Sequence, residues 1–287
     1  MSLAVAPLPR TALSPRRMKP GAAAADVCAL FEEQGYLHVR GILSAGLVRT
    51  LGALMREQLI VQAGYFHATS GIDLMQPAQL QQWMAAHADQ DAWFLGLPRA
   101  TQHLVRGEYP LDVRMRPEFL QLADETALVA LLQHLLGSEA LRLNHPTMLR
   151  FKVPGMEQAK VPLHQDGPYF PHIRNFATVW IPLCAITEEC GGINVLEGSH
   201  RRGPVRHEEA VLWGNTIPHE AATGFTDRHI LMEPGDALIF GPHLQHYTHA
   251  NRSGQVRYSI DSRWFGDATA TARQYFDLRT RKVVQMF

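Results

Sequence analysis

The N-terminal half of the chain places apolar residues at intervals of three and four, the spacing of helices that bury one face. The predicted helices cover residues 22–34, 45–59 and 119–136. Gly35 and Gly137 follow the first and the third of them, where a left-handed C-cap is expected. Ser44 stands at the N-cap position of the second. Between the first two helices, residues 36–39 alternate as a short strand.

Residues 60–116 have no clear period and mix glycine, proline and aromatic residues, with one predicted helix over 77–88. A long irregular segment within a compact domain is often functional, so we interpret this one as a lid or insert. Its aromatic residues are then candidate substrate contacts: Tyr65, Phe66, Trp83 and Trp93. An equally good interpretation is a surface insertion that packs on its own aromatic side chains.

From residue 141 onward, short apolar runs are separated by glycine, proline and asparagine. The predicted strands cover residues 141–153, 160–164, 176–183, 193–196, 229–233, 236–240, 244–249 and 255–264. Many short strands without βαβ alternation or an internal repeat favour a barrel or a double-sheet jelly roll. The predicted fold is mainly β with an N-terminal helical layer. It forms a single domain over residues 21–287 after a mobile lead-in, residues 1–20.

The composition excludes several classes of partner. The 287 residues include 27 basic and 27 acidic side chains, which argues against nucleic acid and against an anionic membrane. The three cysteines form no Cys-x-x-Cys pair, which is typical of a reducing cytoplasm. No apolar run reaches the roughly 18 residues that a membrane span needs. We therefore expect a cytoplasmic protein, a monomer or homodimer, that binds a small molecule.

Two metal-competent side chains lie at His164-Gln-Asp166, just after the apolar run 147–153. On a strand, residues i and i+2 point to the same face, so the imidazole and the carboxylate are expected to converge. His246 follows 82 positions later (246 − 164), at the end of a second apolar strand. Two histidines and one carboxylate on one face form the facial triad of non-heme Fe(II) oxygenases, which leaves positions open for cosubstrate and oxygen.

A histidine–aspartate pair alone has an ordinary interpretation, a half-buried imidazole hydrogen-bonded to its neighbouring carboxylate. His246 and the later Arg257 favour metal binding, because an oxygenase site separately requires a third ligand and a cosubstrate-binding arginine in this order. The residues leave the third ligand open, since His243, His246 and His249 follow one another at intervals of three. On a strand, His246 has the opposite parity to the other two, so all three cannot face one metal.

Polar residues share one face of the last long strand. They are Arg257, Ser259, Asp261 and Arg263. A polar face inside a barrel needs partners, because buried charge without compensation is costly. Arg257 and Ser259 are predicted to hold a dicarboxylate cosubstrate, for which a planar guanidinium is suited. The alternative is a surface Asp261–Arg263 pair with Arg257 in solvent.

Several segments together resemble the phytanoyl-CoA dioxygenase family. They are residues 31–44, 147–155, 162–171, 191–201, 235–240 and 246–257. The resemblance covers about residues 25–265 apart from 60–116. One departure is Glu197-Gly-Ser-His, where the family has Pro-Gly-Ser-His.

This resemblance implies a double-stranded β-helix, a cupin-like jelly roll, over residues 141–265. The family binds Fe(II), uses 2-oxoglutarate as cosubstrate and takes O2 as oxidant. By position, His164, Asp166 and His246 correspond to the iron ligands. His246 is preferred over its neighbouring histidines because it alone has the family's spacing to the arginine, here Arg257.

The same correspondence implies cosubstrate contacts. Arg257 falls where the family's arginine pairs with the far carboxylate of 2-oxoglutarate, and Thr248 falls where a hydroxyl assists it. Met148 and Trp180 lie near family cosubstrate contacts, each after a two-residue gap. Arg174, after the histidine motif, is a candidate substrate contact.

The implied reaction is hydroxylation of a small-molecule natural product or metabolite, with desaturation or ring closure possible on the same residues. No basic cluster marks a site for the phosphates of CoA. Two other functions use the same residues differently. A Zn²⁺ hydrolase would use the three metal-competent side chains but not Arg257. A non-catalytic jelly-roll binding protein would use the histidines only structurally.

Overall fold

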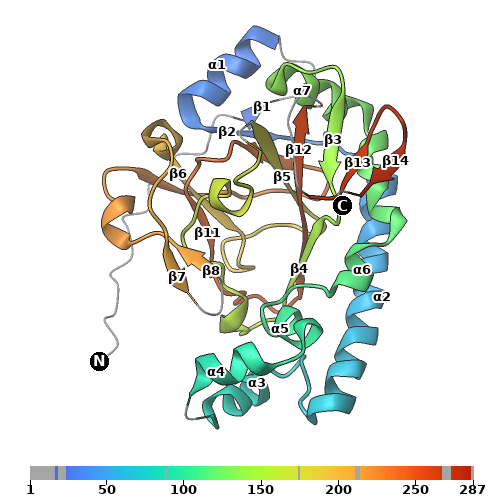
Figure 1. Cartoon of the computed structure of the whole chain (residues 1–287), viewed down its shortest axis with the longest axis vertical. Coiled ribbons are helices and arrows are strands. Elements are labelled where there is room, and N and C mark those ends of the chain that lie inside the picture. Colours follow the sequence, from blue (N-terminus) through green and yellow to red (C-terminus); the bar gives the residue numbers. More distant parts are fainter. Residues whose placement is uncertain are drawn as a thin grey trace.

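The computed structural model describes residues 17–18, 24–87, 89–173, 175–210, 214–266 and 273–285. Helix α2 runs along one side of the molecule, α3–α5 gather at its lower end, and most of the strands lie beside and above them (Figure 1). Among the helices in these ranges, none is both long and apolar enough to cross a membrane.

The helical elements precede most of the strands. They are α1 (Ala24–Gln34), α2 (Ala45–Ser70), α3 (Pro77–Ala85), α4 (Gln90–Gly96), α5 (Arg99–Val105), α6 (Leu111–Arg114) and α7 (Thr126–Leu136). Short 3-10 helices are η1 (Pro117–Asp124), η2 (Glu157–Ala159), η3 (Gly167–Tyr169), η4 (Ser199–Arg202) and η5 (His219–Ala222). The strands are β1 (Arg17–Met18), β2 (Tyr36–Val39), β3 (Leu141–Asn144), β4 (Met148–Lys152), β5 (Phe176–Pro182), β6 (Ile193–Glu197), β7 (Glu208–Ala210), β8 (Gly214–Thr216), β9 (Thr226–His229), β10 (Ala237–Phe240), β11 (His246–Thr248), β12 (Arg257–Gly266), β13 (Tyr275–Asp277) and β14 (Lys282–Val284).

Two sheets carry the fold. The larger has the order β1-β2-β10-β5-β12-β3-β13-β14, with β4 also paired to β12, and the smaller has the order β11-β6-β9. Among the described strands, every pairing in these sheets is antiparallel except β1–β2. Neighbouring strands such as β10 and β5 come from distant parts of the chain. This is the predicted jelly roll, with the helical layer outside the larger sheet.

Side chains alternate along the strands of the large sheet, so that one face packs against the helices and the other faces the space between the two sheets. On β5, Val179 and Ile181 belong to the core beneath the helices, whereas Trp180 faces the space between the sheets with the apolar side chains of the smaller sheet. On β12, Ile260 faces the helices while Arg257 lies on the opposite face, beside the cavity between the sheets. Residues that alternate along a strand point to opposite faces, so the predicted polar face of this strand is confirmed as inward-facing.

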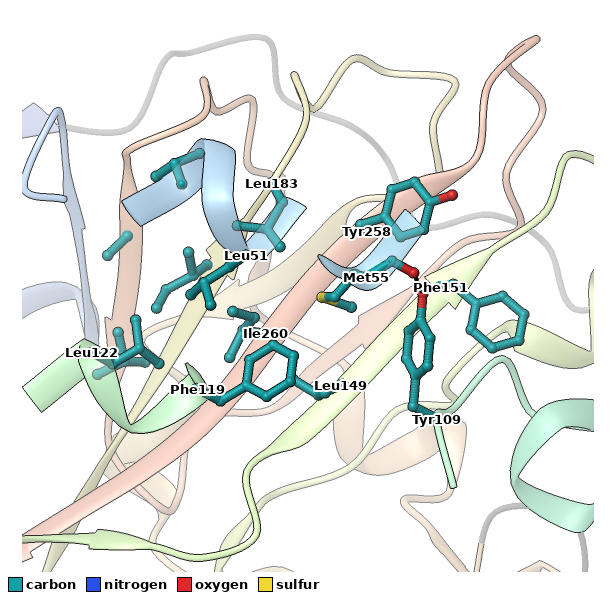
Figure 2. Close-up of a cluster of buried hydrophobic side chains, with 14 of the residues drawn as sticks. Leu51, Met55, Tyr109, Phe119, Leu122, Leu149, Phe151, Leu183, Tyr258 and Ile260 are labelled. Carbon is teal, nitrogen blue, oxygen red and sulfur yellow. Dashed lines mark hydrogen bonds between the residues drawn. The ribbon is translucent and has the colours of Figure 1, made fainter. Parts of the chain in front are cut away.

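The helices are attached to the sheet by a large apolar core. Figure 2 shows α2 and η1 covering β4 and β12. The labelled contacts include Leu51, Met55, Phe119, Leu122, Leu149 and Ile260. Complete burial of one such side chain contributes about 1.5–3 kcal/mol. Tyr109 is fully buried beside them and donates its hydroxyl proton to the carbonyl of Met55 at 2.5 Å. This core fixes the sheet that carries the polar face.

The predicted helix ends are confirmed where a specific cap defines them. The hydroxyl of Ser44 accepts a hydrogen bond from the amide of Leu47, which makes it the N-cap of α2. Gly35 and Gly137 have φ values of 86° and 61°, in the left-handed region that glycine tolerates best.

The prediction that the second helix ends near residue 59 is wrong. Helix α2 continues to Ser70 and ends at Gly71, which has a φ of 74°. Its buried stripe continues through Leu59, Gln62 and Phe66, so the helix still has a face to bury.

The segment 60–116 is mostly helical, contrary to the single helix that was predicted there. Pro77 occupies the first turn of α3, and Pro98 and Pro110 are the N-cap residues of α5 and α6. Proline starts a helix readily because the first amides need no partner within the helix. These prolines therefore mark helix starts. The sequence analysis treated the prolines and glycines of this segment as signs of irregular structure and so missed the short helices between them.

The aromatic residues of this segment pack mainly on one another. The ring centroid of Trp83 lies 5.6 Å from that of Phe66 and 4.7 Å from that of Trp93. Tyr65 is 55% exposed. None of the four lines the cavity between the sheets. The packing is what a surface insertion would have, and the lid function stays a prediction.

The predicted helix over 119–136 is divided. Residues Pro117–Asp124 form the 3-10 helix η1, and α7 begins at Thr126. The break falls at Glu125, whose carboxylate accepts hydrogen bonds from the amide and the hydroxyl of Ser44. A tertiary contact to the start of α2 thus interrupts a periodic apolar pattern.

Several strand predictions need correction. The run 141–153 is two strands, β3 and β4, and 229–233 is replaced by β9 at Thr226–His229. Residues 160–164 form only an isolated bridge at His164. Strands β1, β7, β8, β13 and β14 were not predicted, because each has only two or three residues, too few to show an alternating pattern. The predicted lead-in lies outside the described residues except for β1.

Candidate functional site

The three metal-competent side chains come together between the sheets. His164 forms an isolated bridge with His246, and their backbones exchange hydrogen bonds of 3.1 and 3.0 Å. One donor atom each of His164, Asp166 and His246 lies within 4.8 Å of the other two, and all three residues are buried. Asp166 is not on a strand, because its φ of −75° and ψ of −26° are helical. The side chains converge, although the predicted same-strand geometry is wrong.

Backbone carbonyls fix the tautomers of both imidazoles. Nδ1 of His164 lies 2.8 Å from the carbonyl oxygen of Pro162, and Nδ1 of His246 lies 3.0 Å from that of Leu244. A carbonyl can only accept, so each Nδ1 carries the proton. The Nε2 lone pairs then face Asp166, at 3.7 and 4.0 Å from its Oδ1. This is the orientation that a metal ligand requires.

Electrostatics keep His246 and Asp166 in metal-binding protonation states. Burial first, and then the neighbouring His164, lower the pKa of His246 to about 3, so its imidazole is neutral at physiological pH. Burial opposes ionisation of Asp166, but Arg263 and the two imidazoles outweigh it and hold its pKa well below the usual range. Neutral imidazole and ionised carboxylate are the forms that bind a cation.

Asp166 is held from two sides. Arg263 donates to Oδ1 at 2.9 Å, and the hydroxyl of Thr178 donates to Oδ2 at 2.5 Å. All three residues are buried. These bonds orient the carboxylate independently of a metal.

The structure distinguishes His246 from its neighbours. The ring of His249 packs against those of Tyr247 and His229, with centroids 5.1 and 6.3 Å apart. His243 precedes β11 and is not part of the cluster. The parity argument is consistent with this arrangement, since only His246 turns toward His164.

A cavity opens beside the cluster. Its lining combines the two histidines with cationic, polar and apolar groups: Arg150, Val161, His164, Trp180, Ile193, Phe240, His246, Thr248, Arg257 and Asp261. Asp166 is covered by its own partners and is only 1% exposed.

Arg257 is the unusual member of the lining. Its side chain is 1% exposed, and Nη1 donates to the hydroxyl of Ser259 at 2.5 Å. Nε and Nη2 are buried and have no hydrogen-bond partner among the described residues. Burial lowers the pKa of Arg257 to about 10, so the guanidinium is still charged at neutral pH. The ring of Trp180 lies 5.6 Å from the guanidinium carbon.

Of the other predicted cosubstrate contacts, some line the cavity and some do not. Thr248 and Trp180 line it, and the hydroxyl of Ser259 accepts a hydrogen bond from Arg257. Met148 lies opposite Asp261 in the β4–β12 pairing and is not among the lining residues. Arg174 lies outside the described residues.

The alternative of an Asp261–Arg263 surface pair is confirmed as to the pairing and wrong as to the exposure. Asp261 and Arg263 do pair, at 3.0 Å, but both are buried, and Arg257 is not in solvent. Arg150 donates to Glu108 at 2.7 Å and lies 3.9 Å from Asp261. The pair is therefore part of a buried network that ends on Asp166.

Sequence reasoning missed several supporting residues. Thr178 shares the parity of Trp180 on β5, which was a usable signal. Arg263 was placed on the correct face, but its bond to Asp166 joins residues that are 97 positions apart in the chain. Glu108 and Lys152 carried no local signal, because their partners come from distant segments.

Most of the chain matches a known family. The family model for phytanoyl-CoA dioxygenase (PhyH) matches residues 31–259. The chain belongs to this family. Family membership favours the oxygenase over the hydrolase and the binding module, because its members use non-heme iron and 2-oxoglutarate.

Two curated relatives are hydroxylases. The 1-deoxypentalenic acid 11-beta-hydroxylase of Streptomyces exfoliatus is 29% identical over 247 residues, which cover 81% of this family member and 78% of that protein. The methylphosphonate hydroxylase of Gimesia maris is 25% identical over 205 residues, which cover 69% and 75%.

A solved structure confirms the fold. The epimerase SnoN in complex with Fe³⁺, alpha ketoglutarate and nogalamycin RO matches with a TM-score of 0.59 and 20% identity. The match covers 87% of this chain and 86% of that one. The protein is thus a non-heme iron- and 2-oxoglutarate-dependent oxygenase with a jelly-roll core.

Proposed function

We propose that His164, Asp166 and His246 bind Fe(II) and that Arg257 binds the far carboxylate of 2-oxoglutarate during hydroxylation of a small molecule. The observation that carries this proposal is Arg257, a buried guanidinium with two unpartnered nitrogens in the same cavity as the histidine–aspartate cluster. A buried charge is costly unless an anion or hydrogen bonds compensate it. A carboxylate with its fork of acceptors fits that need.

The donor set suits ferrous iron. Two imidazole nitrogens and one carboxylate oxygen on one side of an ion leave further coordination positions open. When bound, iron supplies the oxidation of a C–H bond to C–OH by O2, coupled to conversion of 2-oxoglutarate to succinate and CO2. The carbonyls of Pro162 and Leu244 keep both Nε2 lone pairs turned inward.

The remaining wall of the cavity excludes water from the reacting atoms. Val161, Trp180, Ile193 and Phe240 supply its apolar lining. An apolar enclosure protects reactive intermediates from side reactions and strengthens the bond between Arg257 and a carboxylate. The protein's own task in this reaction is orientation and exclusion of water.

The substrate we propose is a small acidic metabolite or natural product. The two hydroxylases to which the chain is similar are named for a carboxylic acid and a phosphonate, both small and acidic. Hydroxylation is the outcome that these relatives favour over desaturation or ring closure. The single-domain organisation, the lid function of residues 60–116 and the monomeric or homodimeric state stay predictions.

The direct test is anaerobic titration of the purified protein with Fe(II) and 2-oxoglutarate, followed by visible absorbance. We expect the weak metal-to-ligand charge-transfer band of an iron–2-oxoglutarate chelate. His246→Ala and Asp166→Ala should abolish it, because each removes a ligand. His249→Ala is the matched control, since its ring packs away from the cluster, and should retain the band. Absence of the band in the parent protein, together with tight Zn²⁺ binding, would support the hydrolase instead.

A further inference from the structure

A second buried basic side chain lies directly beside Arg257. Lys152 on β4 is the register partner of Arg257 on β12, and each side chain is 1% exposed. Within the described residues, no carboxylate lies within ion-pair distance of either. Burial of two neighbouring like charges is costly, so their placement needs a reason beyond packing.

The hydrogen bonds of Lys152 point to Thr248. Its Nζ donates to Oγ1 of Thr248 at 2.6 Å and to the carbonyl oxygen of His249 at 2.5 Å. The amide of Val161 also donates to Oγ1 of Thr248, at 3.0 Å. A hydroxyl oxygen has two acceptor sites, and these two donors use both. The hydroxyl proton of Thr248 must therefore be directed elsewhere.

The cavity is the space toward which the Thr248 hydroxyl proton can point. Thr248 and Arg257 both line it, whereas Lys152 is not among the lining residues. When Lys152 is an ammonium group it can only donate, so in that form the Thr248 proton cannot turn back toward Lys152. A group lying on Arg257 would then meet a guanidinium and a hydroxyl donor in the same wall.

We propose that Lys152 is a positioning residue for cosubstrate recognition: it fixes the Thr248 hydroxyl as a donor to the carboxylate held by Arg257. This inference rests on the proposed function, in which that carboxylate is the far end of 2-oxoglutarate. Lys152 acts through Thr248 and does not touch the cosubstrate itself.

The charge of Lys152 depends on whether that carboxylate is bound. Burial first, and then the nearby Arg257, lower the pKa of Lys152 well below its usual range. The other groups that affect it are Arg150, Cys190 and Lys160. A carboxylate bound to Arg257 offsets the repulsion between the two cations and so favours the donating ammonium form. Cosubstrate binding and the donor geometry thus reinforce each other.

The test compares two ligands that differ only in the far carboxylate. The whole chain, loaded anaerobically with Fe(II), is titrated calorimetrically with 2-oxoglutarate and with 2-oxopentanoate, in which a methyl group replaces that carboxylate. Lys152→Met and Thr248→Val should each weaken 2-oxoglutarate binding about tenfold, the loss expected for a hydrogen bond to a charged group. Binding of 2-oxopentanoate should not change, and Thr248→Ser should bind 2-oxoglutarate like the parent protein.

The double variant tests whether the two residues act together. If Lys152 works through Thr248, then Lys152→Met combined with Thr248→Val should bind 2-oxoglutarate no more weakly than Thr248→Val alone. Lys160→Met is the matched control, because Lys160 is exposed and pairs with Glu157. It should leave both affinities unchanged. Should Lys152→Met fail to fold, Lys152→Leu provides the same comparison with a shorter side chain, because leucine also lacks a donor.

Three results would overturn the inference: unchanged 2-oxoglutarate affinity in Lys152→Met, equal weakening of both ligands, or full additivity of the two single effects. A parent protein that does not distinguish 2-oxoglutarate from 2-oxopentanoate would instead refute the proposed role of Arg257. The two failures are therefore separable in one set of titrations.

Discussion

Replacing Arg257 with methionine should stabilise the protein in the absence of 2-oxoglutarate while abolishing its response to 2-oxoglutarate. Methionine keeps most of the apolar stem and removes the charge. Nε and Nη2 of Arg257 are buried without hydrogen-bond partners among the described residues. A buried unsatisfied group costs about 1–3 kcal/mol, so their removal should raise the free energy of unfolding by about that amount. The hydroxyl of Ser259, which loses one donor, reduces the gain slightly.

Ligand should reverse the order of stability. A ligand present at 100 times its Kd stabilises the folded state by about 2.7 kcal/mol. The parent protein with Fe(II) and 2-oxoglutarate should therefore equal or exceed the variant, although it is less stable without ligand. For a domain of this size, each 1 kcal/mol corresponds to a Tm change of about 2–4 °C.

Thermal unfolding under anaerobic conditions, with and without 2-oxoglutarate, measures both effects. Arg228→Met is the matched control, because the charge of Arg228 is already compensated by Glu197 at 3.0 Å. It should lower the Tm and retain the shift with 2-oxoglutarate. The reasoning is refuted if Arg257→Met is less stable than the parent without ligand, or if 2-oxoglutarate still raises its Tm.

Three further predictions concern the supporting structure. Asp166→Asn should lose Fe(II) affinity by at least about tenfold, because it removes the anionic ligand, and equilibrium dialysis of Fe(II) measures this. Glu108→Gln should lower the free energy of unfolding at pH 7 by about 3 kcal/mol. Burial opposes its ionisation, but Arg150 and its other partners lower the pKa of Glu108 from 4.5 to about 2. The stabilisation by ionised Glu108 is therefore complete above about pH 4.5 and is lost as the pH falls toward 2. The free energies of unfolding of parent and variant, measured in urea, should converge over that range. A difference that stays constant with pH would contradict the role given to the Glu108 carboxylate. Gly107→Ala should cost about 1–3 kcal/mol in urea unfolding, because Gly107 has a φ of 70° and a Cβ there would clash with the carbonyl oxygen of Phe151; an unchanged midpoint would show that the turn can relax.

The local pattern of the sequence determined the elements that have a local physical cause. Ser44 as an N-cap and Gly35 and Gly137 as helix ends could be predicted, because each depends on neighbouring residues alone. The inward polar face of β12 followed from strand parity, which places Arg257 and Asp261 on one side. Parity left the choice among three histidines open, and the spacing of the family motif decided it.

Tertiary structure decided what depends on residues far apart in the chain. The helix pattern over 119–136 was broken at Glu125 by a bond to Ser44, 81 positions away. The convergence of His164 and His246 needed a backbone bridge between segments that the sequence keeps apart. Lys152 carried no signal as a partner of Thr248, because a hydrogen bond between distant strands leaves no periodicity to detect. Local propensity acts over a few residues, whereas the contacts that orient a site are made only when the sheets close on each other.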